Sequence, residues 1–412
     1  MSVPALRFKN DDGQEFPEWE EKTLGATLSI FSGYAFSSAD SQDDGVKWLK
    51  IADVGIQQMT PNNISYLPIE LKDKHSNFLV YKNDYVIALT RPILNGKLKI
   101  AKVDEFYDES LLNQRVGKLI TAHDIDFIYF LLQHKNTISH IADTISGTDP
   151  PNLSLNAIKD ICLIIPTNKI EQTKIANFLT AVDEKISILT QKADLLSQYK
   201  KGVMQQIFSQ ELRFKDDDGQ EFPEWEEKTL GEIAKFRRGS FPQPYGLAKW
   251  YDDINGMPFI QVFDVDDNFR LKENTKRRIS KEAQQQSVYV KSGSILVTIQ
   301  GSIGRIAVTQ YDAYVDRTLL LFESFKVDIN KNYFAYILFL LFEIEKEKAP
   351  GGIIKTITKE VLTGFNVFIC DYEEQTKIAN FLSAIDEKIT TNQTQLNAVK
   401  QYKQGLLQQM FV

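Results

Sequence analysis

The chain has 412 residues, which is too long for one ordinary hydrophobic core and suits two or three domains. Hydrophobic residues make up 43% of it and charged residues 25%, a globular balance that excludes a disordered or collagen-like protein. The formal net charge of −7 argues against indiscriminate nucleic-acid binding, unless the acidic residues lie apart from a basic surface.

The first element is a segment that recurs later in the chain. Residues 6–25 read LRFKNDDGQEFPEWEEKTLG, and residues 212–231 match them at 19 of 20 positions. The net negative charge is concentrated in these two segments. Residues 1–25 hold three basic and six acidic side chains, and residues 211–231 hold three basic and eight acidic side chains. The motif around Trp19 fits either a surface that docks another protein or a core tryptophan ringed by solvated carboxylates. We favour the core tryptophan.

Between the repeated segments lie two middles, residues 26–165 and 232–369, whose sequences differ and whose charges nearly cancel. Only short apolar runs correspond, and each precedes a glycine-containing loop, which is typical of strands. The corresponding runs are 49–54 with 260–265, and 86–90 before Gly96-Lys97 with 294–298 before Gly304-Arg305. Near-identical ends around different middles indicate one scaffold that carries two different readers. Drift without selection would have changed the ends as well.

Each middle is followed by a long predicted helix, 171–208 in the first copy and 374–411 in the second. Apolar residues recur there in alternating steps of three and four, which predicts a coiled-coil seam about 57 Å long. Asn392 and the Lys200/Lys403 pair are polar positions in the seam. The alternative is a helix that packs on the sheet of its own domain. In the coiled coil the two helices touch through Val182, Ile186, Leu189, Ile385 and Ile389.

Basic and amide side chains cluster with aromatic residues in both middles. Lys and Arg neutralise phosphates, while Arg, Asn and Gln pair with base edges, so these clusters are candidate DNA contacts. The alternative is a solvated charged face. The candidates in the first middle are Lys50, Arg91, Asn95, Lys97, Lys99, Gln114 and Arg115. Those in the second are Arg237, Arg238, Ser240, Gln243, Tyr245, Gln300, Ser302, Arg305 and Arg317.

Motifs that would indicate catalysis are weak. Residues 149–152 read DPPN and resemble the Pro-Pro-aromatic motif of amino-methyltransferases, but Asn152 stands at the aromatic position and no Gly-rich cofactor loop precedes it. A proline turn before a strand at 161–165 fits better. Residues 70–72 match a nuclease metal site only faintly, and residues 301–304 lack the Lys-Ser/Thr of a P-loop. We expect no catalytic residue.

Cysteine and histidine usage also limits the chemistry. Two distant cysteines exclude a disulfide framework, and four scattered histidines offer no metal-ligand spacing. No apolar run reaches the length of a membrane span. We therefore expect a cytoplasmic protein without a metal site or a cofactor.

Together these features resemble the DNA-specificity subunit of type I restriction–modification systems. The resemblance rests on the L-R-F…W-E-E-K-x-L-G opening at Leu6 and Leu212 and on the E-Q-x-x-I-A-x-F-L…D-E-K-I helix start at Glu171 and Glu374. The duplicated order and the hydrophobic-Thr…Gly-[Lys/Arg] segments, which end at residues 97 and 305, complete it. It covers essentially the whole chain.

The resemblance implies an α+β fold with a pseudo-two-fold tandem duplication, in which two globular α/β target-recognition domains are joined by two long antiparallel coiled-coil helices. The expected divisions are 1–168 (first recognition domain), 169–210 (first spacer helix), 211–370 (second domain) and 371–412 (second helix). Each domain would read one half of a bipartite, asymmetric double-stranded DNA site. The chain would be non-catalytic and would assemble with two methyltransferase subunits and with restriction subunits. No family motif fixes which residues read bases.

Two other functions remain open from the sequence. A self-contained DNA methyltransferase or nuclease with its own recognition domains would need a Gly-rich cofactor loop and an intact Pro-Pro-aromatic motif, and the sequence lacks both. A coiled-coil scaffold without a DNA role would show no salt-dependent DNA binding.

Overall fold

The computed structural model describes residues 4–61, 64–145, 150–348 and 359–412. The chain forms two compact units: unit 1 contains residues 1–191 and 394–412, and unit 2 contains residues 192–393. The division falls within both long helices, α5 (Lys169–Phe208) and α10 (Tyr372–Met410), so each helix contributes one part to each unit.

Unit 1 is built around two small sheets. Its strands are β1 (Glu20–Thr23), β2 (Ser29–Ser32), β3 (Val46–Leu49), β4 (Tyr66–Leu67), β5 (Leu79–Val80), β6 (Tyr85–Ala88), β7 (Ile93–Leu94), β8 (Lys97–Leu98), β9 (Ile100–Lys102), β10 (Ser110–Leu112), β11 (Val116–Ile120) and β12 (Cys162–Ile165). The sheets have the orders β4-β3-β10-β5 and β2-β11-β6-β9, and the pairs β1-β12 and β7-β8 stand apart. Among the described strands of these sheets, β3 and β10 pair in parallel and the other pairs are antiparallel. Its shorter helices are α1 (Leu24–Thr27), α2 (Glu70–Lys74), α3 (Ile125–Leu131) and α4 (Lys135–Ile145).

Unit 2 repeats this topology. Its strands are β13 (Glu226–Thr229), β14 (Ala234–Arg238), β15 (Met257–Ile260), β16 (Arg277–Ile279), β17 (Val288–Val290), β18 (Ile295–Thr298), β19 (Ile306–Val308), β20 (Ala313–Val315), β21 (Leu319–Phe325) and β22 (Asn366–Ile369). The sheets are β16-β15-β20-β17 and β14-β21-β18-β19, with β13-β22 apart, and β15 and β20 pair in parallel. Its helices are α6 (Leu230–Ile233), α7 (Lys281–Gln284), α8 (Lys331–Lys348) and α9 (Lys359–Thr363). The duplication therefore extends through middles whose sequences have diverged.

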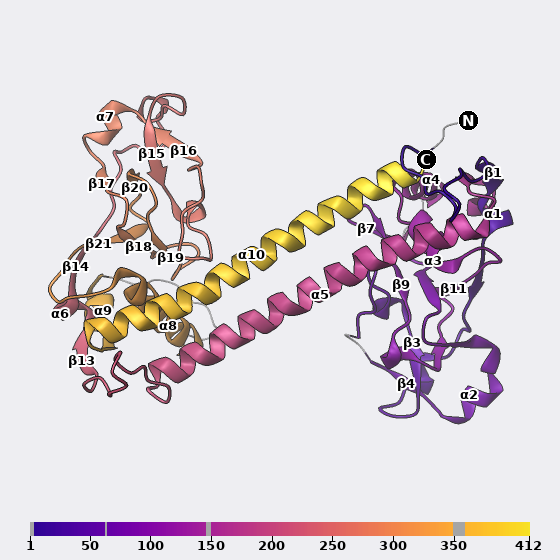
Figure 1. Cartoon of the computed structure of the whole chain (residues 1–412), viewed down its shortest axis with the longest axis horizontal. Helices are drawn as coiled ribbons and strands as arrows, with labels where there is room; N and C mark the ends of the chain where they lie inside the picture. The colour runs from indigo at the N-terminus through magenta and orange to yellow at the C-terminus, as the bar shows by residue number, and fades with distance from the viewer. Residues whose placement is uncertain (1–3, 62–63, 146–149, 349–358) are drawn as a thin grey trace. The chain divides into compact units, whose positions relative to one another are not determined.

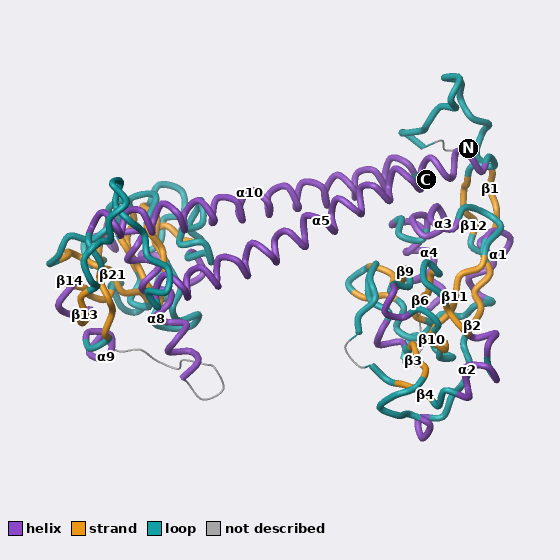
Figure 2. Tube along the Cα trace, turned by 60° about the horizontal axis from the view of Figure 1, so that its bottom comes forward, coloured by secondary structure: helices purple, strands orange, loops and turns teal. Residues whose placement is uncertain are grey.

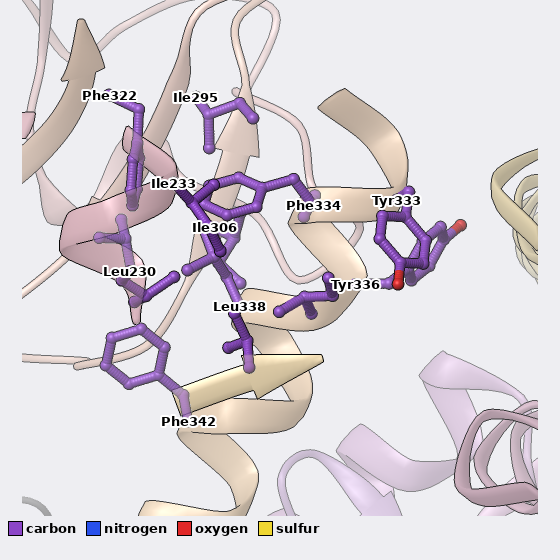
Figure 3. Packing of buried hydrophobic residues seen from close by; sticks show 14 of the residues in the cluster. Leu230, Ile233, Ile295, Ile306, Phe322, Tyr333, Phe334, Tyr336, Leu338 and Phe342 are labelled. Atoms are coloured by element: carbon purple, nitrogen blue, oxygen red, sulfur yellow. The ribbon is translucent and has the colours of Figure 1, made fainter. Parts of the chain in front are cut away.

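Continuous apolar runs form the central strands because both of their faces are covered. All four residues of β6 and all four of β18 are buried. In unit 2 the strands pack against α8, where Phe334, Leu338 and Phe342 point toward Leu230 and Ile233 of α6 (Figure 3). Each large apolar side chain buried in this way contributes about 1.5–3 kcal/mol of burial free energy.

The two long helices are antiparallel within each unit, as the family resemblance implies. In unit 1 the first part of α5 lies beside the last part of α10 (Figures 1 and 2), and Asp183 pairs with Lys403 at 2.7 Å. In unit 2 the corresponding pair has the helices exchanged: Lys200 of α5 pairs with Asp386 of α10 at 2.6 Å. The polar seam lysines are thus neutralised by the opposite helix. Within the described residues, no helix is both long enough and apolar enough to cross a membrane.

The two predictions for these helices, coiled coil or packing on the own domain, are both partly right. Ile175, Leu179 and Val182 of α5 belong to the same core as Trp19 and Leu406. In unit 2, Ile378, Leu382 and Ile385 of α10 belong to the same core as Trp225 and Met204. The start of each helix therefore packs on its own unit and on the end of the other helix.

A buried ion pair fastens each repeated segment to the start of a long helix. Arg7 donates from Nε and Nη2 to the two carboxylate oxygens of Glu171 at 2.9 Å, and Trp19 Nε1 donates to the same carboxylate at 3.2 Å. Glu171 is 0% exposed and Trp19 is 4% exposed. Because the neighbouring Glu18, Glu20 and Glu21 are exposed, the prediction of a core tryptophan is confirmed.

The second copy of this ion pair has the same geometry. Arg213 donates to the two carboxylate oxygens of Glu374 at 2.8 Å each, and Trp225 Nε1 donates to this carboxylate at 3.0 Å. One backbone hydrogen bond is also duplicated. The Leu6 N–H donates to the carbonyl of Gln409 at 2.9 Å, and the Leu212 N–H donates to that of Gln206 at 2.9 Å. The end of α10 thus meets the first repeated segment as the end of α5 meets the second.

Two details of the sequence comparison were wrong. The apolar runs at 49–54 and 260–265 are not strands throughout. Strand β3 ends at Leu49 and strand β15 ends at Ile260, the first residue of each run, and a 3-10 turn follows in both cases. The correspondence around β6 is also displaced by two residues. Ala88 N–H donates to the carbonyl of Lys99, as Thr298 N–H donates to that of Arg305. Lys99, and not Lys97, is therefore the counterpart of Arg305.

Candidate nucleic-acid interface

Three connections meet at one edge of unit 1. They are the turn after β3, the corner after β10 and the segment between β6 and β9. The Asn113 N–H donates to the carbonyl of Leu49 at 3.0 Å, and the Leu89 N–H donates to that of Arg115 at 2.8 Å. Lys99 Nζ donates to the carbonyl of Ile51 at 3.0 Å. Because β3 and β10 are parallel, both connections leave the sheet at the same edge.

Unit 2 has the same edge. The Asp316 N–H donates to the carbonyl of Ile260 at 3.0 Å, and the Ile299 N–H donates to that of Thr318 at 2.9 Å. Arg305 Nη1 donates to the carbonyl of Val265 at 3.3 Å. We call this feature the loop edge of each unit: residues 50–53, 90–99 and 113–115 in unit 1, and residues 261–264, 300–305 and 316–318 in unit 2.

A buried aspartate fixes the first turn of both loop edges. The Lys50 N–H donates to Asp53 Oδ2 at 2.8 Å, and the Gln261 N–H donates to Asp264 Oδ2 at 2.8 Å. Asp53 is 0% and Asp264 1% exposed, and this burial raises the pKa of both carboxyls. The turn therefore presents Lys50 and Gln261, each three residues before the aspartate, in a fixed conformation, which suits a recognition surface.

The loop edge of unit 1 holds a basic pocket of about 360 Å³. Its lining includes Arg91, Lys99 and Arg115, with Thr90, Ile51, Ala52 and Pro150 between them. Arg91 and Arg115 are exposed, whereas partial burial lowers the pKa of Lys99. Three cations around a small opening form a surface suited to phosphate oxygens or purine acceptors.

The other candidates of the first middle are dispersed. Lys50 lies in the turn after β3, over the ring of Trp48 at 5.4 Å, and Gln114 is exposed in the corner after β10. Asn95 and Lys97 belong to the β7-β8 hairpin, and Lys97 lies near Lys403 of α10, whose pKa is lowered by burial and by the Lys97 charge. The structure therefore does not bring Lys97 and Asn95 into the basic pocket.

The candidates of the second middle form three groups. The guanidinium of Arg317, at the loop edge, lies over the Tyr245 ring, with its carbon 5.5 Å from the ring centroid. Gln300, Ser302 and Arg305 lie in the segment between β18 and β19, and Arg305 pairs with Asp267 at 3.1 Å. The third group lies at the end of β14 and after it: Arg237 and Arg238 are its last residues, Arg237, Arg238 and Gln243 are exposed, and Ser240 Oγ donates to the carbonyl of Gln286.

Two residues of this edge were not among the sequence candidates. Gln261 Nε2 lies 2.6 Å from Tyr245 Oη, and Asp316 accepts the Tyr245 hydroxyl at 2.7 Å. The signal for Gln261 was present, because the sequence comparison aligned it with Lys50. No sequence signal distinguished Asp316. The DPPN segment has no catalytic geometry in its described part: Thr90 Oγ1 donates to Asn152 Oδ1 at 2.7 Å, while residue 149 lies outside the described residues.

The comparisons with known proteins agree with this architecture. The family model described as "Type I restriction modification DNA specificity domain" matches residues 17–198 and again residues 223–401. The chain therefore belongs to the type I restriction modification DNA specificity domain family.

Several specificity subunits are similar in sequence. The MjaVIII specificity subunit of Methanocaldococcus jannaschii is 30% identical over 51% of this chain and 50% of its own length. The EcoBI specificity subunit of Escherichia coli is 27% identical over 72% of this chain and 64% of its own. These matches thus span half to two thirds of those relatives. The putative MjaX specificity subunit of M. jannaschii is 24% identical over 97% of this chain and 94% of its own.

Solved structures share the fold. The S subunit of the type I restriction-modification system from M. genitalium aligns with a TM-score of 0.63 and 16% identity, covering 100% of this chain and 99% of that one. A chain from a structure of type I restriction-modification complex assembly aligns with a TM-score of 0.52 and 17% identity, covering 95% and 97%.

Proposed function

We propose that this chain is the DNA-specificity subunit of a type I restriction–modification system. It reads a bipartite, asymmetric site in double-stranded DNA, one half with each recognition domain, and it is not itself a catalyst. Two methyltransferase subunits modify the DNA, and restriction subunits join the full assembly in the cytoplasm. Membership of the specificity-domain family supports this function over a self-contained methyltransferase or nuclease.

The observation that carries the proposal is the pair of equivalent loop edges with different side chains. The backbone hydrogen bonds make Lys50 the counterpart of Gln261, Asn113 the counterpart of Asp316, and Arg115 the counterpart of Thr318. A common framework with different hydrogen-bonding groups recognises two different base sequences. The two copies of the buried ion pair, in contrast, use identical residue types: Arg7, Trp19 and Glu171 correspond to Arg213, Trp225 and Glu374.

We further propose that residues 1–168 and 211–370 are the recognition domains and that residues 169–210 and 371–412 are the spacer helices. Within the domains, we propose that the loop edges contact base edges and phosphates. The stacked and pocket-lining cations (Arg91, Lys99, Arg115 and Arg317) are better placed for this than Lys97, which lies near α10.

The experiment is an exchange of the first middle. Residues 26–165 are replaced by the first middle of another family member, and the methylated sites of a host that expresses the partner subunits are mapped. We expect one half-site to change and the other to remain. A change in both half-sites would contradict independent reading, and an absence of bipartite methylation with the unmodified chain would contradict the proposed function itself.

A further inference from the structure

Arg317 differs in its surroundings from other arginines of unit 2. It is exposed at the corner after β20, with its guanidinium carbon 5.5 Å from the centroid of the Tyr245 ring. Among the residues that the structure describes, it forms no ion pair, whereas Arg305 pairs with Asp267 at 3.1 Å and Arg237 with Glu323 at 3.9 Å. The face of Arg317 is thus supported while its donors stay free.

The supporting ring is itself held in place. The Tyr245 hydroxyl donates to Asp316 Oδ2 at 2.7 Å, and Gln261 Nε2 donates to the same hydroxyl at 2.6 Å. Asp316 is 1% exposed, and its other oxygen accepts the N–H of Thr318 at 2.9 Å and the hydroxyl of Thr318 at 2.6 Å. Both carboxylate oxygens are therefore satisfied within the loop edge, which fixes the ring below Arg317.

This arrangement suits a directional contact. A guanidinium held over an aromatic face is restricted in its movement and keeps donors directed outward. Those donors match the O6 and N7 acceptors that guanine presents in the major groove. Arginine can also bind phosphate bidentately, but a lysine ammonium binds phosphate as a point charge, so a fixed guanidinium plane is needed for reading a base edge and not for a phosphate contact.

We propose that Arg317 reads a guanine in the half-site of unit 2, and that Tyr245, held by Asp316 and Gln261, is its positioning residue. The inference rests on the proposed function and adds the base and the device that recognises it. Unit 1 has Gln114 at the position of Arg317 and Asn113 at that of Asp316, so the device belongs to one half-site alone.

The test uses the complex of the full chain with its methyltransferase subunits. Methylation mapping gives the site, and the exchange of residues 26–165 assigns one half to unit 2. Binding is then measured to duplexes in which each G·C pair of that half is replaced in turn by A·T. We expect the unmodified complex to discriminate by about 10- to 100-fold at one such pair.

Arg317→Ala and Arg317→Lys should both lose that discrimination, because a single ammonium does not make the bidentate contact. Tyr245→Phe keeps the ring and removes both hydroxyl hydrogen bonds, so we expect a partial loss at the same pair with unchanged reading of the first half-site. Arg277→Ala is the matched control: Arg277 also stacks, over Tyr251 at 3.9 Å, but it pairs with Asp253 at 3.2 Å. It should leave the discrimination unchanged.

Three results would overturn the inference. One is a half-site of unit 2 without a guanine. Another is unchanged discrimination in Arg317→Ala. The third is that Arg317→Ala weakens binding equally to all duplexes, lowers the slope of log affinity against log salt concentration by about one, and differs from Arg317→Lys, which binds almost normally. That result would assign a phosphate contact to Arg317. Each of these leaves bipartite methylation by the unmodified complex intact, so it is distinguishable from failure of the proposed function.

Discussion

Glu171 shows how one residue joins distant parts of unit 1. Its carboxylate is fully buried between Arg7 and Trp19, so its removal leaves the Arg7 cation without its counter-charge and the Trp19 N–H without its acceptor. We expect Glu171→Ala to lower the free energy of unfolding of unit 1 by about 3–5 kcal/mol. Denaturant unfolding measures this, and the exposed Glu18→Ala is the control. A loss below about 1 kcal/mol would contradict the role of the buried pair.

His134 gives unit 1 a pH dependence. It is 5% exposed beside the Phe411 ring, at 6.1 Å between centroids, and burial lowers its pKa below the ordinary 6.5. A depressed pKa means that the unfolded state binds the proton more readily, so stability is full at neutral pH and falls as pH drops below 6.5. His123 acts in the same direction, since burial also lowers its pKa. We expect thermal unfolding between pH 7 and 5 to shift less in His134→Gln than in the unmodified chain. An identical shift in both would refute the assignment, and the exposed His140→Gln is the control.

Among the elements, the helix pair carries charge inside its seam. Burial raises the pKa of Asp183 and lowers that of Lys403, so desolvation outweighs their mutual attraction. We expect Asp183→Asn to destabilise unit 1 by about 3–5 kcal/mol, because Lys403 stays buried without a counter-charge. The double variant Asp183→Leu/Lys403→Met should recover most of this loss. Denaturant midpoints of the single and double variants test the prediction, and a double variant as unstable as the single one would contradict it.

The long helices could be predicted from the sequence, because a seam repeated over five heptads is a local and redundant signal. The turn at residues 50–53 could not, because an apolar run looks like a strand until Asp53 is known to be buried under it. The two-residue displacement around β6 arises because the described segment between β18 and β19 has no counterpart of the β7-β8 hairpin. For the candidate site, the arginines and Tyr245 were identifiable by residue type, but the contacts that hold Tyr245 in place were not. Asp316 supports Tyr245 from 71 residues away, and no sequence spacing reveals that contact.

At the scale of the whole molecule, the duplicated backbone hydrogen bond implies that the chain termini could be moved to the junction between the two copies. The Leu6 N–H bonds the Gln409 carbonyl as the Leu212 N–H bonds the Gln206 carbonyl. Gln206 and Leu212 are joined by the intervening residues of the chain, whereas Gln409 and Leu6 lie near opposite ends of the sequence. We expect a circular permutant that joins Val412 to Ser2 by a short linker and opens near Gln210 to support methylation of the same site. Gln210 is exposed, so the new ends meet no core. Methylation mapping tests this. A soluble, folded permutant without activity would count against the equivalence of the two junctions.

The composition of unit 1 has a consequence for synthesis on the ribosome. Its core contains Trp19 from the first repeated segment and Phe127 from the first middle, together with Leu406, Met410 and Phe411 from the end of α10. Unit 2, in contrast, is one continuous stretch, residues 192–393. Domains usually complete their folding in the order in which they emerge. Here that order is reversed: unit 2 has all its residues first, while the nascent unit 1 keeps an apolar face uncovered until the last turns of α10 leave the exit tunnel.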